Sequence, residues 1–274
     1  MPSNFSTIGV PIVDSEKEYT AWATRAVSEG QVVPVGGGEY RVLNSDAGTQ
    51  LWAAVDRRGR VVGLTPHYAG AARCWGRLTD RIRRDDESSF DGAFDGWACD
   101  DRTASPDDAS SDVTPLLFDV PDALAHRDLR LPAIADVQIA AFAHECTWHR
   151  DVDAFRSAQA SEVMPFAEEA FAYLDVFAEG PDRSAIAILS GRVRDTAIRV
   201  NELTGLGFRW AAVRTLIGDI DVVADPAVVD GEPTAGGVVI GSFWLSGRIS
   251  TVHVEAEVKV QGANRLRRRL WPRP

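Results

Sequence analysis

Residues 184–260 show the most regular alternation of apolar and polar side chains in the chain, and a period of two is typical of β-strands. The pentapeptide Leu-Ser-Gly-Arg-Val at 189–193 is almost repeated as Leu-Ser-Gly-Arg-Ile at 245–249. We therefore expect one small β-module, with the two pentapeptides on neighbouring strands and their glycines at bends. The pattern predicts five successive strands, at 185–200, 208–215, 219–224, 237–249 and 251–260.

The order of these strands, with one irregular insert between the third and the fourth, resembles a five-stranded OB-fold barrel. The resemblance is carried by SGRV at 190–193, TGLGFRWAAVRT at 204–215, GDIDVVAD at 218–225 and AGGVVIGSFWLSGRI at 235–249. Many OB-fold domains bind single-stranded nucleic acid or oligosaccharides on the face of their second and third strands. The resemblance therefore implies a binding face on the corresponding strands of this chain.

The candidate binding residues of this module lie on its first three strands: Arg192, Arg194, Arg199, Arg209, Asp219 and Asp221. Because Phe208 and Trp210 alternate with Arg209, we expect both aromatic rings to face the barrel core. Phe243 and Trp244 are adjacent and cannot both face inward, so we interpret Trp244 as a surface or interface residue. Asp219 and Asp221 share one strand face, and paired carboxylates can carry acid–base chemistry. In so acidic a chain, such pairs also arise by chance.

The first 75 residues predict a strand, a helix and then several strands. Residues 5–13 are apolar and β-branched, as in a buried strand. Ser15 and Glu18 have the spacing of a capping box, and an apolar helical face follows as far as Gly30. Short strands are expected at 31–35, 39–43, 50–55 and 60–64.

This element order resembles half of a glyoxalase/bleomycin-resistance (vicinal oxygen chelate) module. That family places His or Glu metal ligands on inward-facing strand positions, and the first predicted strand here has neither residue. The resemblance therefore concerns topology, and the family's metal chemistry is not carried over.

The sequence predicts the α+β fold class, with a mixed N-terminal region followed by the OB-like barrel. Residues 85–112 are rich in Asp, Ser and Gly, but their spacing does not match an EF-hand calcium loop. We interpret this segment as a solvated acidic loop. The expected parts are an α+β domain at 1–130, a connecting region at 131–183 with a strand at 136–148 and helices at 150–159 and 165–178, the barrel at 184–260, and a basic tail at 261–274.

Catalytic motifs are missing from the sequence, which contains no GxSxG elbow, no P-loop and no GxGxxG turn. His144 and His149 lie five residues apart, whereas zinc proteases need two His four apart on a helix. We therefore expect neither a metal nor a cofactor. The alternative is a small-molecule enzyme, possible also in a metal-dependent form, whose pocket in the N-terminal half is lined by Trp52, His67, Tyr68, His144 and Glu145.

The formal net charge of −11 is concentrated in the N-terminal two thirds of the chain. Residues from 184 onward carry 12 basic and 9 acidic side chains, which leaves 17 and 31 for the first 183. Such an acidic chain disfavours nucleic acid, because binding to nucleic acid rests on cation contacts. Three widely spaced cysteines, the lack of a signal peptide and the lack of an apolar run of ~20 residues predict a cytoplasmic protein without a membrane span.

These features favour a non-catalytic binding or interaction protein whose OB-like module recognises a protein or small-molecule partner. The small-molecule enzyme and single-stranded nucleic-acid binding by the OB-like module stay open as alternatives. Self-association is also open, with Trp244 and exposed strand edges as the contact.

Overall fold

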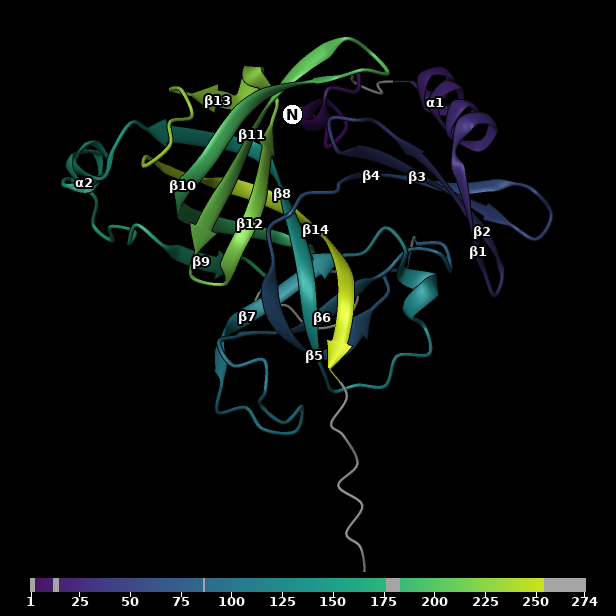
Figure 1. The fold of residues 1–274 in the computed structure, drawn as a ribbon, viewed down its shortest axis with the longest axis horizontal. Coiled ribbons are helices and arrows are strands. Elements are labelled where there is room, and N and C mark those ends of the chain that lie inside the picture. Colours follow the sequence, from purple (N-terminus) through teal and green to yellow (C-terminus); the bar gives the residue numbers. More distant parts are fainter. Residues whose placement is uncertain (1–2, 12–14, 86, 176–182, 254–274) are drawn as a thin grey trace, which may run out of the picture.

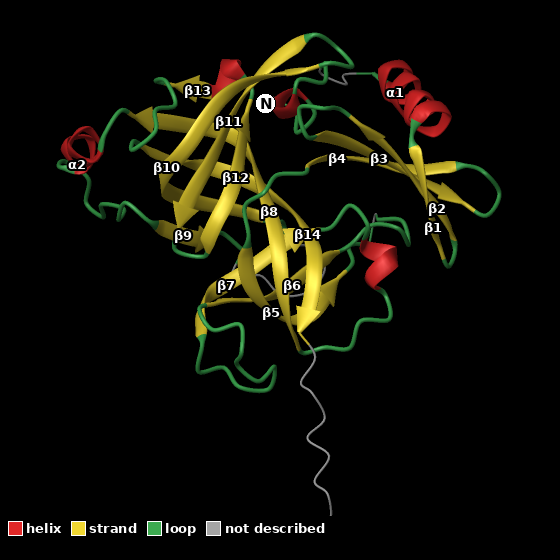
Figure 2. Cartoon of the chain, in the orientation of Figure 1, coloured by secondary structure: helices red, strands yellow, loops and turns green. Residues whose placement is uncertain are grey.

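The computed structural model describes residues 3–11, 15–85, 87–175 and 183–253. This part of the chain is mostly β-structure, arranged as a four-stranded and a ten-stranded sheet (Figures 1 and 2). Its helices are α1 (Glu16–Glu29) and α2 (Val152–Gln159), and its 3₁₀ turns include η1 (Ser6–Ile8), η2 (Ala123–His126) and η4 (Pro226–Val228). The strands are β1 (Gln31–Val35), β2 (Gly38–Asn44), β3 (Thr49–Asp56), β4 (Val61–Tyr68), β5 (Cys74–Ile82), β6 (Ala93–Cys99), β7 (Asp112–Asp119), β8 (Ala133–His149), β9 (Ala170–Tyr173), β10 (Ile186–Asn201), β11 (Leu206–Thr215), β12 (Gly218–Ala224), β13 (Val229–Asp230) and β14 (Val238–His253).

The N-terminal region is an antiparallel meander, β1-β2-β3-β4, with α1 packed against it. The predicted capping box is confirmed, since the Ser15 side chain accepts a hydrogen bond from the backbone N–H of Glu18. The strand expected at residues 5–13 is wrong, because a 3₁₀ turn (η1) occupies this place. Gly9 follows that turn in the left-handed conformation (φ 69°), which a regular strand cannot accommodate.

The ten-stranded sheet closes into two rings that share the long strands β8 and β14. In one ring, β5, β6 and β7 pair in succession, β7 pairs with β14, and β5 pairs with β8. In the other, β10, β11 and β12 pair in succession, β12 pairs with β8, and β10 pairs with β14. Figure 1 shows β8 and β14 running from the upper group of strands to the lower one. The chain thus contains two three-stranded meanders, β5–β7 and β10–β12, and the long strand that follows each of them takes part in both rings.

The register of the shared strands shows that the two rings are arranged alike around one row of residues. Ser246 of β14 lies opposite Ala140 of β8. On the outer sides, Asp119 of β7 pairs with Ser246 in the parallel sense, and Asp221 of β12 pairs with Ala140 in the same sense. An aspartate of the third strand therefore lies next to the shared pair in each ring: the partly exposed Asp119 at the end of β7, and the buried Asp221 in the middle of β12.

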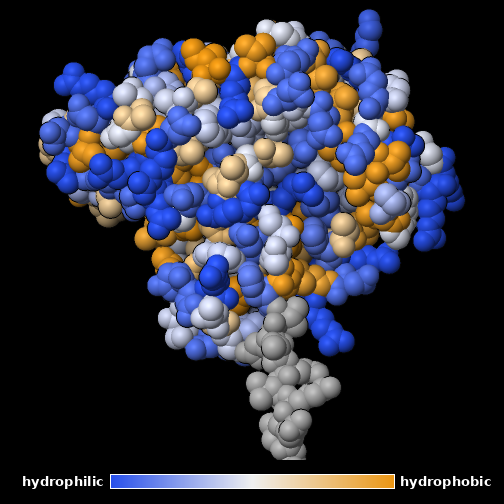
Figure 3. Space-filling view, viewed as in Figure 1, coloured by the Kyte–Doolittle hydropathy of each residue, from blue (hydrophilic) through white to orange (hydrophobic). Residues whose placement is uncertain are grey.

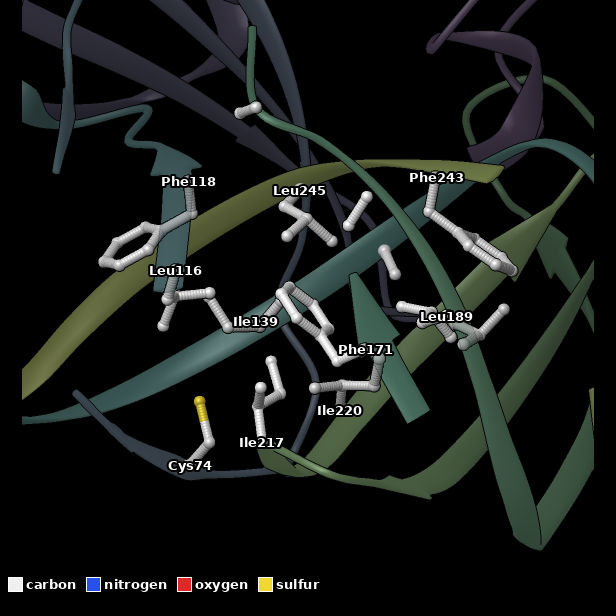
Figure 4. Packing of buried hydrophobic residues seen from close by; sticks show 14 of the residues in the cluster. Cys74, Leu116, Phe118, Ile139, Phe171, Leu189, Ile217, Ile220, Phe243 and Leu245 are labelled. Atoms are coloured by element: carbon white, nitrogen blue, oxygen red, sulfur yellow. The ribbon is translucent and has the colours of Figure 1, made fainter. Parts of the chain in front are cut away.

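The hydrophobic core lies inside the two rings and is continuous between them. Phe118 and Ile139 from one ring and Leu189 and Phe243 from the other belong to the same cluster of buried residues (Figure 4). A second cluster fills the space between the N-terminal sheet and the outer face of the second ring. Phe208 and Trp210 belong to this second cluster, so they do not face the barrel interior as expected.

The predicted fold class, an α+β protein with a separate five-stranded barrel, is wrong. The predicted strands at 185–200, 208–215 and 219–224 are confirmed as β10–β12, and the two pentapeptides lie on neighbouring strands. The expected fifth strand does not exist as such: residues 251–253 continue β14, and 254–260 lie outside the described residues. Its place in the ring is taken by β8, which comes earlier in the chain and is shared with the other ring.

Two further expectations fail for the same reason, that the sheet is larger than predicted. The segment 85–112 is not a loop throughout, because β6 lies within it. The helix expected at 165–178 is wrong where the structure describes it, since β9 occupies its middle and pairs with β10. None of the described helices is long and apolar enough to cross a bilayer.

Candidate functional site

A chain of hydrogen-bonded polar side chains lies inside the protein where the N-terminal sheet meets the two rings. Its members are His67 of β4, Ser246 of β14, Gln138 of β8, Asp221 of β12 and Trp210 of β11, all at most 9% exposed. His67 Nδ1 lies 2.9 Å from Ser246 Oγ, and His67 Nε2 lies 3.0 Å from Gln138 Oε1. Gln138 Nε2 donates to Asp221 Oδ2 (3.2 Å), and Trp210 Nε1 donates to Asp221 Oδ1 (3.0 Å).

Asp221 sets the direction of every hydrogen bond in this chain. Because the carboxylate accepts, Gln138 turns its amide nitrogen toward Asp221 and its carbonyl oxygen toward His67. His67 therefore carries its proton on Nε2 and accepts the Ser246 hydroxyl proton at Nδ1. Burial, and secondly the charge of Arg248, lower the pKa of His67 to about 3, so the imidazole is neutral at neutral pH.

Ser246 and His67 are hydrogen-bonded in the way that a nucleophile and its base are, but a substrate cannot reach them. Both side chains are 0% exposed, so no substrate atom can approach the Ser246 hydroxyl. The group that orients His67 is the amide of Gln138 rather than a carboxylate. The pair therefore ties β4 to β14 and gives no support to nucleophilic catalysis.

The loop between β4 and β5 wraps closely around the Asp221 carboxylate. The backbone N–H of Ala72 donates to Asp221 Oδ2 over 3.2 Å. A Cβ atom added at Gly70 would lie 1.9 Å from the same oxygen, which is far inside van der Waals contact. Burial raises the pKa of Asp221, while its three hydrogen-bond donors act in the opposite direction. Only glycine fits at position 70 while Asp221 keeps its place.

We predict that Gly70→Ala destabilises the protein by roughly 2–3 kcal/mol, because the loop must move and the Ala72–Asp221 hydrogen bond is lost. Urea unfolding at neutral pH measures the change. Gly207→Ala is the matched control, since its Cβ would meet no atom closer than 3.7 Å. A loss of stability no larger for Gly70→Ala than for Gly207→Ala would contradict the close packing around Asp221.

A cavity of about 350 Å³ opens beside this hydrogen-bonded chain, on the side of Gln138. Gln138 is 3% exposed and uses one amide N–H on Asp221, which leaves its second N–H without a partner in the described structure. Arg248 Nε is also buried and has no partner among the described residues. The cavity is lined by Gly70, Arg73, Gln138, Arg248, Ile249 and Ser250, together with Ala69. Gln138 and Arg248 therefore both line the cavity, and each has an N–H group without a partner in the described structure.

Aromatic rings hold two arginines around the site. The Arg248 guanidinium lies 4.9 Å from the ring centroid of Trp52, and its Nη2 atom lies 3.2 Å from Asp122 Oδ2. The Arg199 guanidinium lies 4.3 Å from the ring centroid of Trp210. Such cation–π contacts restrain a guanidinium without neutralising its charge.

Three of the five residues predicted for the N-terminal pocket lie at this site. His67 belongs to the hydrogen-bonded chain, Trp52 lies under Arg248, and Tyr68 is buried against Phe208, with ring centroids 6.1 Å apart. His144 and Glu145 lie elsewhere. His144 Nε2 is 3.2 Å from Asn4 Oδ1, and Glu145 is exposed further along β8.

Of the residues predicted for the OB-like module, Asp221 lies at the centre of the site and Arg199 beside it. The other five are dispersed. Arg192 pairs with Glu168 (3.0 Å), Arg209 with Glu232 (3.2 Å) and Asp219 with Arg214 (3.5 Å), while Arg194 is exposed. Trp244 is partly buried rather than a surface residue, and its Nε1 donates to Asp119 Oδ2 over 2.6 Å.

The sequence analysis missed Gln138, Ser246, Arg73 and Arg248. Gln138 had a signal, because it is a polar residue within the long apolar run that forms β8. Ser246 and Arg248 fall within the second pentapeptide, where they were interpreted only as part of a fold pattern. Arg73 carries no sequence signal that separates it from other surface arginines.

Within residues 3–253, as far as they are described, no three His, Cys, Asp or Glu side chains come together as a metal site. No protein-family model matches the chain, and neither the curated proteins nor the solved structures contain a significant match to it.

Proposed function

We propose that the protein binds a small carboxylate in the cavity between the β4–β5 loop, β8 and β14, without transforming it. The observation that carries the proposal is the second amide N–H of Gln138, which has no partner in the described structure, beside the Arg73 and Arg248 side chains that line the same cavity. A buried donor without a partner costs about 1–3 kcal/mol. A carboxylate in the cavity can accept from the Gln138 amide with one oxygen and from an arginine of the lining with the other.

The charges around the cavity favour an anion. Arg73 and Arg248 line it, whereas Asp122 and Asp221 contact Arg248 and Gln138 from positions outside the lining. A ligand therefore meets guanidinium and amide groups, with the carboxylates behind them. Hydrogen bonds from a charged donor to a carboxylate contribute about 1.5–3 kcal/mol each.

The size of the cavity, and the face of the molecule seen in Figure 3, favour a small molecule over a protein partner. A cavity of about 350 Å³ is at the lower end of the range for small-ligand sites. On the face seen in Figure 3, apolar side chains form small separate groups among hydrophilic ones. A stable protein contact usually needs a larger continuous apolar patch. The relation to OB-fold domains, and nucleic-acid binding through Arg192 and Arg194, stay predictions.

Binding is tested by thermal unfolding and calorimetry with acetate, malonate, inorganic phosphate and neutral acetamide. We expect a carboxylate to raise the melting temperature and acetamide to leave it unchanged. Arg73→Ala should weaken carboxylate binding roughly 10-fold or more through the loss of one charged donor. Arg248→Met should also weaken it, since the second guanidinium of the lining is removed.

The matched control is Arg58→Ala, which removes an exposed arginine of the β3–β4 turn that does not line the cavity. It should leave carboxylate affinity unchanged. If no carboxylate shifts the melting temperature, or if Arg58→Ala weakens binding as much as Arg73→Ala, the proposed site is wrong.

A further inference from the structure

A second cavity, of about 270 Å³, lies between the β5–β6 hairpin and the η2 turn and shares no lining residue with the first. Three arginines line it: Arg81, Arg83 and Arg127. Its apolar floor includes Phe94, which is 2% exposed, and Leu124. This cavity therefore combines three positively charged side chains with an apolar surface, although the chain as a whole is acidic.

Two of these guanidinium groups donate hydrogen bonds to backbone carbonyl oxygens, which do not neutralise their positive charge. Arg81 Nη2 donates to the carbonyl oxygens of His126 (3.0 Å) and Leu129, and the guanidinium lies 5.3 Å from the Phe94 ring centroid. Arg127 Nη1 donates to the carbonyl oxygen of Gly36. The position of each guanidinium is fixed by these contacts, and its other N–H groups stay available.

Carboxylates neutralise this group of arginines only in part. Arg127 Nε lies 3.3 Å from Asp128, whose side chain is 89% exposed, so solvent screens that pair. Arg81 and Arg83 have no carboxylate partner within the described residues. A ligand that carries two negative charges meets the strongest attraction here, because Arg donors bind phosphate oxygens in bidentate geometry.

Asp91 adds a hydrogen-bond acceptor to the same cavity. Its Oδ2 atom accepts from the backbone N–H (3.1 Å) and the hydroxyl (2.7 Å) of Ser88, and Oδ1 has no partner in the part of the chain that is described. Burial raises the pKa of the Asp91 carboxyl. A ligand hydroxyl can donate to Oδ1, and a hydroxyl on a carbon skeleton can do so while every phosphoryl oxygen stays with the arginines, which the P–OH of inorganic phosphate cannot.

From this combination we infer a second binding site, for a small phosphate ester that carries a free hydroxyl group. The phosphoryl oxygens take donors from Arg81, Arg83 and Arg127. The hydroxyl donates to Asp91, and the carbon skeleton lies over Phe94. This site does not depend on carboxylate binding in the first cavity.

Calorimetry on the full chain with glycerol 3-phosphate, inorganic phosphate and glycerol tests the inference. We expect glycerol 3-phosphate to bind at least several-fold more tightly than inorganic phosphate, and glycerol not to bind. Arg83→Ala, which removes an exposed side chain that has no partner among the described residues, should weaken both phosphate ligands about 10-fold. Asp91→Asn should reduce the preference for glycerol 3-phosphate over inorganic phosphate.

Two control variants separate this site from general charge effects and from the first cavity. Arg58→Ala removes an equally exposed arginine, and Arg73→Ala removes a cation from the first cavity; both should leave the affinity for glycerol 3-phosphate unchanged. Equal affinity for inorganic phosphate and the ester, or equal weakening by Arg58→Ala and Arg83→Ala, would overturn the inference. So would a lack of binding at millimolar concentrations. Each of these results leaves the carboxylate proposal standing.

Discussion

Replacing Gln138 by leucine should lower the free energy of unfolding by about 3–5 kcal/mol, measured by urea unfolding at neutral pH. The Gln138 side chain is the only direct link between His67 and Asp221 in the described structure. Leucine leaves His67 Nε2–H without an acceptor and takes one donor from the buried Asp221 carboxylate. Both groups stay buried among β4, β8 and β12, where water cannot replace the lost partner.

The control for this prediction is Gln50→Leu, because Gln50 is a strand glutamine of similar hydrogen bonding but partial exposure. Its amide bonds to Asn44 and Trp52 at the surface of the N-terminal sheet. That change should cost about 1–2 kcal/mol, because it frees one part-buried donor, the Trp52 indole N–H, and no buried charge. The double variant His67→Phe with Gln138→Leu should lose less than the sum of the single losses, because the two residues form one network. Additive losses would show that the two side chains act independently.

Local strand patterns could be predicted from the sequence, but the pairing that closes the rings could not. Alternation identified β10, β11 and β12 with bounds close to those observed. Alternation says which side chains share a face, and not which strand lies beside it. β12 pairs with β8 across about 80 residues of sequence, and nothing in either strand specifies that partner. A fifth strand was therefore sought nearby in sequence, at 251–260.

The same limit explains why the predicted orientation of the two aromatic side chains on β11 is wrong. Phe208 and Trp210 were expected inside the barrel because they alternate with a charged residue. In the structure both faces of β11 are covered, one by the ring interior and the other by the N-terminal sheet, and the aromatic face is the second one. Periodicity distinguishes the two faces of a strand but does not show which buried layer each face meets.

Some residues of the site could be predicted from the sequence, but they belonged to two competing hypotheses. His67, Trp52 and Tyr68 came from the hypothesis of an enzyme pocket, and Asp221 from that of a binding module. The structure places them together because β8, with Gln138, runs between β4 and β12. A residue that links two groups through hydrogen bonds has no spacing rule in the sequence, so it is found only once the fold is known.

Lowering the pH should destabilise the protein through His67, starting near its ordinary pKa of 6.5. The pKa of His67 is lowered to about 3 in the folded protein, chiefly by burial, so the folded state binds this proton less readily than the unfolded state. The stability that His67 contributes is complete above pH 6.5 and is lost as the pH falls toward 3, by about 1.4 kcal/mol per pH unit. We expect a loss of about 3 kcal/mol between pH 7 and pH 4 from this residue alone.

Urea unfolding from pH 7 to pH 4 of the wild type and of His67→Gln isolates this contribution, because glutamine cannot titrate. The difference in unfolding free energy between the two proteins should shrink steadily as the pH falls. Carboxyls such as Asp221 and Asp119, whose pKa values are raised, change stability in the opposite direction and are common to both proteins. Ser246→Ala is the matched control, because it removes a hydrogen bond of the network and keeps the buried imidazole. It should therefore retain the wild-type slope, and a slope shared by all three proteins would contradict a neutral, buried His67.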